Sequence, residues 1–175
     1  MQPSRYHLAL RSLHWVCAVL LIIGLVMGTF VLDKTPNSSP EKINALRGHM
    51  IFGVLILVLT VIRLIVRLRS THPKPVFTGI ALADRFAPLM HWGLYTLIFV
   101  IAVSGIGIAA LTGLPEIVFA GDGILPTDFK DLPPRAVHGV VAKLLMLAIA
   151  LHVIAALFHQ FVRKDRLLSR MGFGK

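Results

Sequence analysis

The sequence is poor in cysteine and in acidic residues, and both shortages limit what the protein can be. Cys17 is the only cysteine among the 175 residues, so no disulfide can form within the chain. Eight aspartates and glutamates stand against 18 lysines and arginines, and none of the eight lies well inside an apolar run. This makes a histidine-lined transporter for a divalent metal or for protons a distant alternative. No P-loop, G-x-S-x-G or H-E-x-x-H motif occurs, so hydrolysis and phosphoryl transfer have no support.

Apolar residues make up 56% of the chain and gather into four runs of membrane-spanning length. We expect four transmembrane helices, over about residues 13–32, 48–65, 86–111 and 136–162. Pro36 and Pro40 fall in the stretch from Asp33 to Arg47, which we expect to be a loop. Little chain remains for a soluble domain. The sequence therefore predicts an all-α, integral membrane four-helix bundle, with residues 1–175 as a single domain.

The net charge of +10, taken alone, would suggest a nucleic-acid partner, but the position of the basic residues argues otherwise. Twelve lysines and arginines lie on the side of the N-terminus, the second connection and the C-terminus, against five on the other side. By the positive-inside rule we expect both termini in the cytoplasm. Lipid, not nucleic acid, is the expected surrounding.

Histidines inside the spans are the residues that point to chemistry. His138 and His152 lie 14 residues apart in the last run, which puts them on one helix face and about 21 Å apart along it. With the expected topology, depths match in two pairs: His49 with His138 on the outer side, and His14 with His152 on the inner side. A single in-span histidine is often a structural residue, but four that match by depth are harder to explain in that way.

Two neutral imidazoles that face each other inside an apolar bundle can hold a haem b, with their nitrogens about 4 Å apart through the iron. Gly48, Gly53 and Gly139 lie beside the outer histidines and would let a flat group approach the backbone. Arg47 and Arg135 flank the same pair and could neutralise haem propionates. No C-x-x-C-H occurs, so covalent haem attachment is not indicated.

Short motifs follow one another along nearly the whole chain: Arg5-Tyr6, His14-Trp15, Gly48-His49, Ile62-Arg63-Leu64 with Arg67, His91, His138-Gly139 and His152. In this order they resemble the bacterial cytochrome b561 family, which is related to the di-haem cytochrome b subunits of nickel-iron hydrogenase and formate dehydrogenase. The resemblance implies a membrane bundle with two haems b, ligated by His14 with His152 and by His49 with His138. His91 also enters from the cytoplasmic side and competes for the inner site.

The resemblance implies one-electron transfer across the bacterial inner membrane, because iron with two axial imidazoles has no open position for oxygen chemistry. Proteins of this kind pass electrons to or from ubiquinone, and some look like superoxide oxidases that take electrons from periplasmic superoxide. His159 and His91 are candidate quinone-site residues. Lys143 is expected to snorkel to the interface, or alternatively to stabilise a propionate or a semiquinone. A membrane anchor subunit of a dehydrogenase or hydrogenase is the alternative function.

Overall fold

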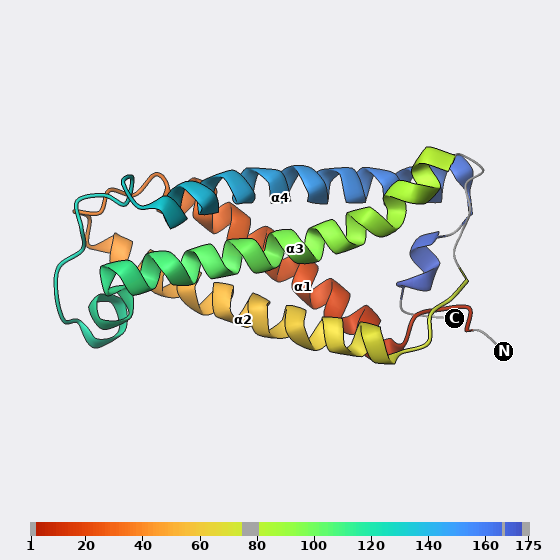
Figure 1. Ribbon diagram of the computed structural model, residues 1–175, viewed down its shortest axis with the longest axis horizontal. Helices are drawn as coiled ribbons and strands as arrows, with labels where there is room; N and C mark the ends of the chain where they lie inside the picture. Colours follow the sequence, from red (N-terminus) through yellow and green to blue (C-terminus); the bar gives the residue numbers. More distant parts are fainter. Residues whose placement is uncertain (1–2, 75–80, 166, 173–175) are drawn as a thin grey trace.

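The computed structural model describes residues 3–74, 81–165 and 167–172, without the side chains of residues 81–83, and the described part is all-helical. Four long helices run alongside one another (Figure 1): α1 (Leu8–Val26), α2 (Glu41–Arg69), α3 (Ala81–Thr112) and α4 (Pro133–Leu157). The π-helical segments η1 (Met27–Leu32) and η3 (Phe158–Arg163) continue α1 and α4, and the shorter elements are η2 (Glu116–Ala120) and η4 (Leu167–Arg170). Each expected span falls within one continuous helical stretch. The predicted all-α architecture is confirmed.

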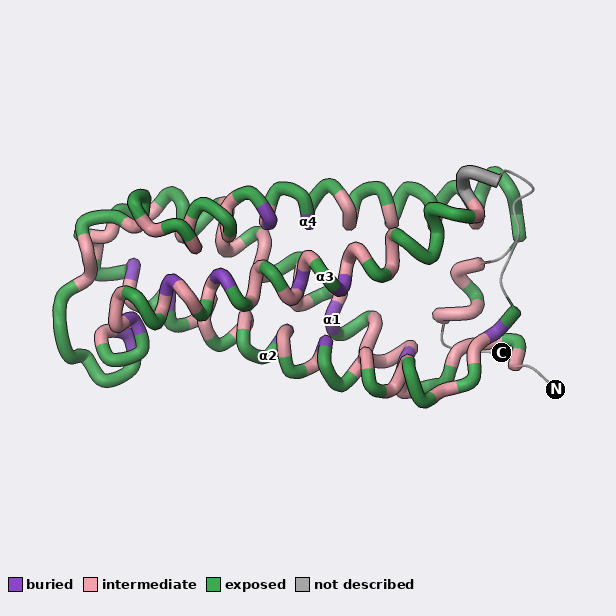
Figure 2. The backbone as a smooth tube through the Cα atoms, viewed as in Figure 1, coloured by how far each residue is buried: buried purple, intermediate pink, exposed green. Residues whose placement is uncertain are grey.

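Four helical stretches are long and apolar enough to cross a membrane: Leu8–Leu32, Glu41–Arg69, Asp84–Thr112 and Pro133–Arg163. Large apolar side chains such as Phe30, Val103 and Phe161 are exposed on the outside of the bundle. Figure 2 shows exposed residues along the whole length of the helices. Contact of so much apolar surface with water would be unfavourable by about 25 cal/mol per Å². The outside of the bundle therefore faces lipid.

The expected loop from Asp33 to Arg47 is shorter in the structure, because α2 already begins at Glu41. The Glu41 carboxylate lies in the first turn, where it interacts favourably with the helix dipole. The Lys42 ammonium donates to the carbonyls of Leu32 and Thr35 at 2.5 and 2.7 Å, which ties this polar turn to the end of η1. Apolar periodicity could not reveal the turn, since its stabilising contacts are polar.

The helices associate as two pairs. α1 packs along α2, α3 packs along α4, and contacts between α2 and α3 join the pairs. Among the described residues, α4 makes hardly any close backbone approach to α1 or α2. A small core of Ile56, Ile98 and Leu145 links α2, α3 and α4 near mid-bundle. Side chains of α4 therefore meet those of α1 and α2 across a wider separation than the one between α1 and α2 or between α3 and α4.

The first and last described segments lie at the same end of the bundle (Figure 1). The Tyr6 N–H donates to the Arg170 carbonyl at 3.2 Å, and the Trp15 indole donates to the Met171 carbonyl at 2.9 Å. Arg170 in turn donates to the carbonyl of Lys74, in the connection between α2 and α3, at 2.7 Å. We call this the termini end. The opposite end, which holds residues 33–40 and 113–132, is the far end.

Candidate functional site

Four in-span histidines meet in two pairs, one towards each end of the bundle. His49 of α2 and His138 of α4, the far-end pair, have ring centroids 6.0 Å apart and ring planes at 70°. His14 of α1 and His152 of α4, the termini-end pair, have centroids 6.3 Å apart and the same angle of 70°. These are the two pairs that the matching of depths predicts.

The separations suit one iron atom between the two rings of each pair. Metal–imidazole bonds are about 2 Å long, so two coordinating nitrogens stand about 4 Å apart and their ring centroids about 6 Å apart. In the described part of the chain, no group of three or more His, Cys, Asp or Glu is arranged to hold a metal ion. Paired imidazoles are instead the axial arrangement of many electron-transfer haems.

Small residues surround the far-end pair. A Cβ added to Gly105 of α3 would lie 3.3 Å from Cε1 of His138, and one added to Gly28 of α1 would lie 3.6 Å from Cε1 of His49. A Cβ on Gly53, one turn from His49, would meet nothing within 4 Å. Nδ1 of His49 is buried without a hydrogen-bond partner, which is costly unless the ring serves a bound group. The residues at this end fit a flat macrocycle held by imidazole.

Helix α3 orients the ring of His138. Its Nδ1 lies 3.1 Å from Oγ of Ser104, and that hydroxyl donates its proton to the Ile101 carbonyl at 2.8 Å. Since the hydroxyl proton is used, the oxygen accepts from the Nδ1–H of His138. The lone pair of Nε2 is then free for a metal, as expected of a ligand ring oriented by its neighbours.

The termini-end pair has a third histidine beside it. The ring centroid of His91, from α3, lies 5.5 Å from that of His152, with the planes at 78°. Nδ1 of His91 donates to the Ala87 carbonyl at 2.8 Å, which leaves the Nε2 lone pair free. His91 is therefore a structural competitor of His14. The separation and angle of His14 and His152, however, match the far-end pair more closely.

The structure also places a cation, Arg63 of the Ile62-Arg63-Leu64 motif, at the termini-end pair. Nη1 of Arg63 donates to the Tyr95 hydroxyl at 2.6 Å, and its guanidinium carbon lies 5.1 Å from the Tyr95 ring centroid. Nη2 lies 3.4 Å from Nδ1 of His14. An arginine inside an apolar run is itself a signal of function, and this signal could have identified Arg63 from the sequence.

The model of the prokaryotic cytochrome b561 family matches residues 5–174. The chain belongs to this family. It is 27% identical to cytochrome b561 homolog 2 of Escherichia coli, over 97% of this chain and 92% of that protein. It is 29% identical to the probable superoxide oxidase CybB of Yersinia pestis, over 96% of each chain, and 30% identical to cytochrome b561 homolog 1 of E. coli, over 91% and 92%.

Membership of the cytochrome b561 family makes this chain a haem b-binding membrane protein of redox electron transfer. The two arginines that flank the far-end pair of this cytochrome both have protein partners. Arg47 donates to the Val118 carbonyl from Nε at 3.1 Å and from Nη2 at 2.6 Å. Arg135 pairs with Asp33 at 3.2 Å. Both arginines lie at the far end, and their interaction with haem propionates remains a prediction.

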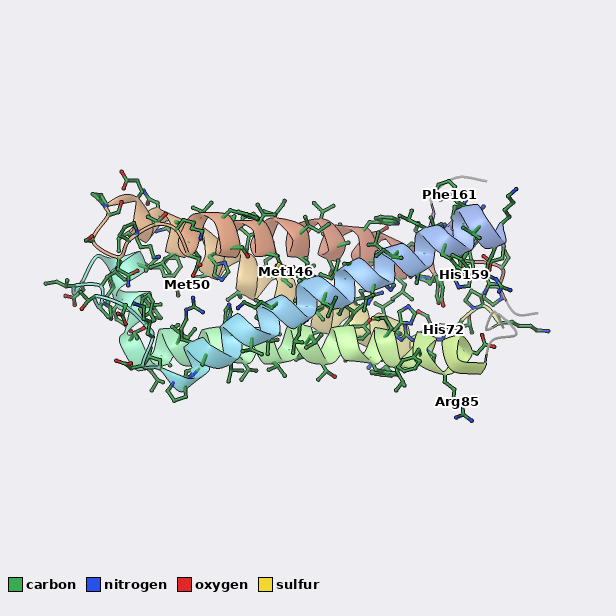
Figure 3. All side chains as sticks on the ribbon, turned by 90° about the horizontal axis from the view of Figure 1, so that it is seen from above. Met50, His72, Arg85, Met146, His159 and Phe161 are labelled. Carbon is green, nitrogen blue, oxygen red and sulfur yellow. The ribbon has the colours of Figure 1, made fainter. Side chains whose placement is uncertain are left out.

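His159 of this cytochrome lies at the termini end, in η3 (Figure 3). Its Nδ1 is 2.6 Å from Oδ2 of Asp165, and Nε of Arg163 is 3.8 Å from the same oxygen. Partial burial raises the pKa of the Asp165 carboxyl, but the hydrogen bond and charge of His159 outweigh this, so the pKa lies below its ordinary value. Lys143 is exposed on the outside of α4, as a snorkelling side chain would be.

Proposed function

We propose that this protein is a di-haem b cytochrome that passes single electrons across the bacterial inner membrane and exchanges them with ubiquinone. The observation that carries the proposal is the presence of two imidazole pairs with nearly equal geometry towards opposite ends of one bundle. Fourteen residues of α4 separate His138 from His152, about 21 Å along the helix. When bound, haem b with two axial imidazoles supplies one-electron transfer and offers no open position for oxygen chemistry.

The residues of the chain hold and orient the two groups. His49 with His138 would hold the far-end haem, and His14 with His152 the termini-end haem. Ser104 fixes the tautomer of His138 through its hydroxyl oxygen. The apolar outside of the helices keeps water away from both pairs. Arg47 and Arg135 are proposed to meet propionates at the far end, where paired guanidinium and carboxylate groups form strong hydrogen bonds.

Superoxide is the proposed donor, at the far end. The distribution of Lys and Arg favours a cytoplasmic termini end, so the far end would face the periplasm. A relative of nearly equal length from Y. pestis is named as a probable superoxide oxidase, which supports the same donor here. In the proposed reaction two superoxide anions each lose one electron and become dioxygen. One ubiquinone gains the two electrons and two protons and becomes ubiquinol.

His159 and His91 are the proposed quinone-site residues. Both belong to the end of the bundle that the proposal places in the cytoplasm. The Nδ1 of each ring already has a protein partner, Asp165 for His159 and the Ala87 carbonyl for His91. The Nε2 of either ring is then the atom that would form a hydrogen bond with a quinone oxygen or exchange a proton with it.

The experiment that tests the proposal counts haems and then supplies substrates. A reduced-minus-oxidised spectrum with a pyridine haemochrome assay on the purified protein is expected to give two haems b per chain. Superoxide-dependent reduction of ubiquinone is then expected in proteoliposomes, and much slower reduction in liposomes of the same composition without the protein. One haem or none in folded protein made with adequate haem would contradict the di-haem proposal. Two haems without superoxide-driven reduction would exclude superoxide as the donor.

A further inference from the structure

We propose that Arg63 raises the reduction potential of the termini-end haem above that of the far-end haem, so that electrons move from the far end to the termini end. The inference rests on the proposed di-haem function. In this transfer one electron leaves a ferrous iron at the far end and reduces a ferric iron at the termini end, with no bond formed or broken.

The position of Arg63 is held from two directions. The hydroxyl of Tyr95, a residue only 4% exposed, accepts from Nη1 at 2.6 Å. The guanidinium also lies over the Tyr95 ring, with its central carbon 5.1 Å from the ring centroid, as in a cation–π contact. Nη2 points to His14, with 3.4 Å between it and Nδ1. The cation is therefore fixed beside one imidazole of the termini-end pair.

The charge of Arg63 is not neutralised by a carboxylate. Its guanidinium contacts a phenol and an imidazole, and among the described residues it forms no ion pair with Asp or Glu. Its Nε is buried and has no hydrogen-bond partner. Within an apolar bundle a fixed charge of this kind acts with little screening by water or salt.

A fixed cation favours the reduced state of a neighbouring iron. Ferric iron carries one more positive charge than ferrous iron, so a nearby guanidinium opposes the ferric state more strongly. The 3.4 Å distance between Nη2 and His14 is long for a hydrogen bond, so the effect on His14 is mainly that of charge. The expected result is a higher reduction potential at this end.

The cation near the far-end pair is Arg135, whose charge acts on His138 but is paired with the Asp33 carboxylate at 3.2 Å. Nδ1 of His138 meets the uncharged hydroxyl of Ser104, and Gly28 and Gly105 lie where an added Cβ would come within 3.6 and 3.3 Å of the rings. Arg47 and Arg135 at this end are bound to the Val118 carbonyl and to Asp33, and neither makes a hydrogen bond with His49 or His138 among the contacts of the described residues. The two pairs thus share their geometry and differ in nearby charge, and that difference separates the two potentials.

A simpler role for Arg63 would be to snorkel to the interface, since it lies six residues before the end of α2 at Arg69. Its contacts argue against this role, because the hydrogen bond to Tyr95 runs inward to α3 and the guanidinium faces His14 of α1 rather than the outside. Arg67, one turn later, lies over the ring of the exposed Trp92 instead, with its guanidinium carbon 5.8 Å from the ring centroid. An arginine that only marked the interface would resemble Arg67.

Spectroelectrochemical titration of the purified cytochrome tests the inference without using its activity. The two potentials are assigned by repeating the titration in a His49→Ala background, which is expected to keep only the termini-end haem. In Arg63→Gln the termini-end potential is expected to fall. The equilibrium constant for transfer towards that haem would then fall about tenfold, equivalent to about 59 mV for one electron. Arg63→Lys, which keeps the charge, is expected to restore most of the potential.

The control is Lys143→Met, which removes a cation from the exposed outside of α4 and is expected to leave the termini-end potential unchanged. If Arg63→Gln does not retain the termini-end haem, Tyr95→Phe is the second test. This change removes the hydroxyl that holds the Arg63 guanidinium in place. It is expected to lower the reduction potential of the termini-end haem by less than Arg63→Gln would. An unchanged or higher potential in these variants, with both haems bound, overturns the inference and leaves the di-haem function standing. Absence of haem from the wild-type protein would overturn both.

Discussion

The two ends of the bundle hold histidine pairs that are nearly the same in geometry and different in their surroundings. Both pairs have ring planes at 70° and centroids about 6 Å apart. The far-end pair lies beside glycines and one serine hydroxyl, and the cation near it, Arg135, is paired with the Asp33 carboxylate. The termini-end pair has a third histidine and a guanidinium beside it.

This difference indicates that binding and tuning are separate tasks in this fold. The common spacing of the rings is what an iron atom requires, so it recurs at both ends. A neighbouring charge changes which oxidation state of the iron is favoured rather than whether the iron binds. The charge beside the histidines can therefore differ between the two ends.

The largest effect is expected from removing an axial histidine. His14→Ala should lose the termini-end haem and halve the haem content, because one imidazole of that pair is gone. His91→Ala should keep two haems, since the His14–His152 pair remains intact. His72→Ala is the control, because its ring contacts Tyr6, at a centroid distance of 5.8 Å, rather than either pair. Retention of two haems in His14→Ala, with loss in His91→Ala, would make His91 the ligand.

A smaller effect is expected from Ser104→Ala at the far end. This change removes the oxygen that orients Nδ1 of His138 at 3.1 Å. Loss of such an orienting partner typically lowers metal-site affinity by about 10–100-fold. The rate at which the purified protein loses its far-end haem to apomyoglobin would measure the change.

The matched control for Ser104→Ala is Thr112→Ala. Thr112 makes the same kind of bond within α3, from its hydroxyl to the Ile108 carbonyl at 2.7 Å, and it forms no hydrogen bond with a histidine among the described residues. Equal haem loss in the two variants would show that the hydroxyl stabilises the helix and does not orient His138.

Part of this arrangement can be predicted from the sequence. The lengths of the apolar runs locate the four helices. The spacing of His138 and His152 on one helix, together with the alternating topology, predicts that His138 meets His49 and that His152 meets His14. These features depend on periodicity along one helix or on depth, which a sequence contains directly. The start of α2 at Glu41 cannot be found in this way. The first turn of α2 is held by hydrogen bonds from Lys42 to backbone carbonyls, and such polar contacts leave no apolar periodicity in the sequence.

The Arg63–Tyr95 hydrogen bond is another feature that the sequence could not predict. It joins residues 32 apart on two helices whose relative rotation is set by packing. His91 presents the same difficulty, since depth allows it to reach the termini-end pair but only the rotation of α3 decides that it does. The sequence therefore predicts which histidines can meet, while tertiary packing determines the charge around them.

A further prediction concerns the space at the far-end pair. In Gly105→Ala the new Cβ would lie 3.3 Å from Cε1 of His138, so the ring must shift by a few tenths of an ångström. Added volume in a packed site costs about 1 kcal/mol at the low end, which corresponds to roughly fivefold weaker binding of the far-end haem. Haem titration of the apoprotein would measure this affinity.

Gly93→Ala is the matched control for Gly105→Ala, because Gly93 lies in the same helix and its new Cβ meets nothing within 4 Å. That variant should bind the far-end haem as the wild type does and is expected to gain helix stability, since alanine is favoured over glycine by about 1 kcal/mol within helices. Equal weakening by both substitutions would mean that glycine in α3 matters for helix packing rather than for access to the ring of His138.

The smallest effect is expected from removing a carboxylate charge at either end of the bundle, at Asp165 or at Asp33. His159 and Asp165 meet at 2.6 Å with 16% and 22% of their side chains exposed, whereas Arg135 and Asp33 meet at 3.2 Å with 39% and 54% exposed. Asp165→Asn should therefore destabilise the protein more than Asp33→Asn at pH 7, by up to about 1 kcal/mol. Thermal unfolding in detergent across pH measures both.

The pH dependence of Asp165→Asn distinguishes an ion pair from simple packing. The pKa of Asp165 is lowered in the folded protein, so its stabilisation is present above the unfolded value of about 3.9 and is lost as the pH falls through the lowered folded value. The difference in unfolding temperature between wild type and Asp165→Asn should therefore shrink in strong acid. A difference that stays constant from pH 7 to below the folded pKa would mean that shape, not charge, holds His159 in place at the termini end.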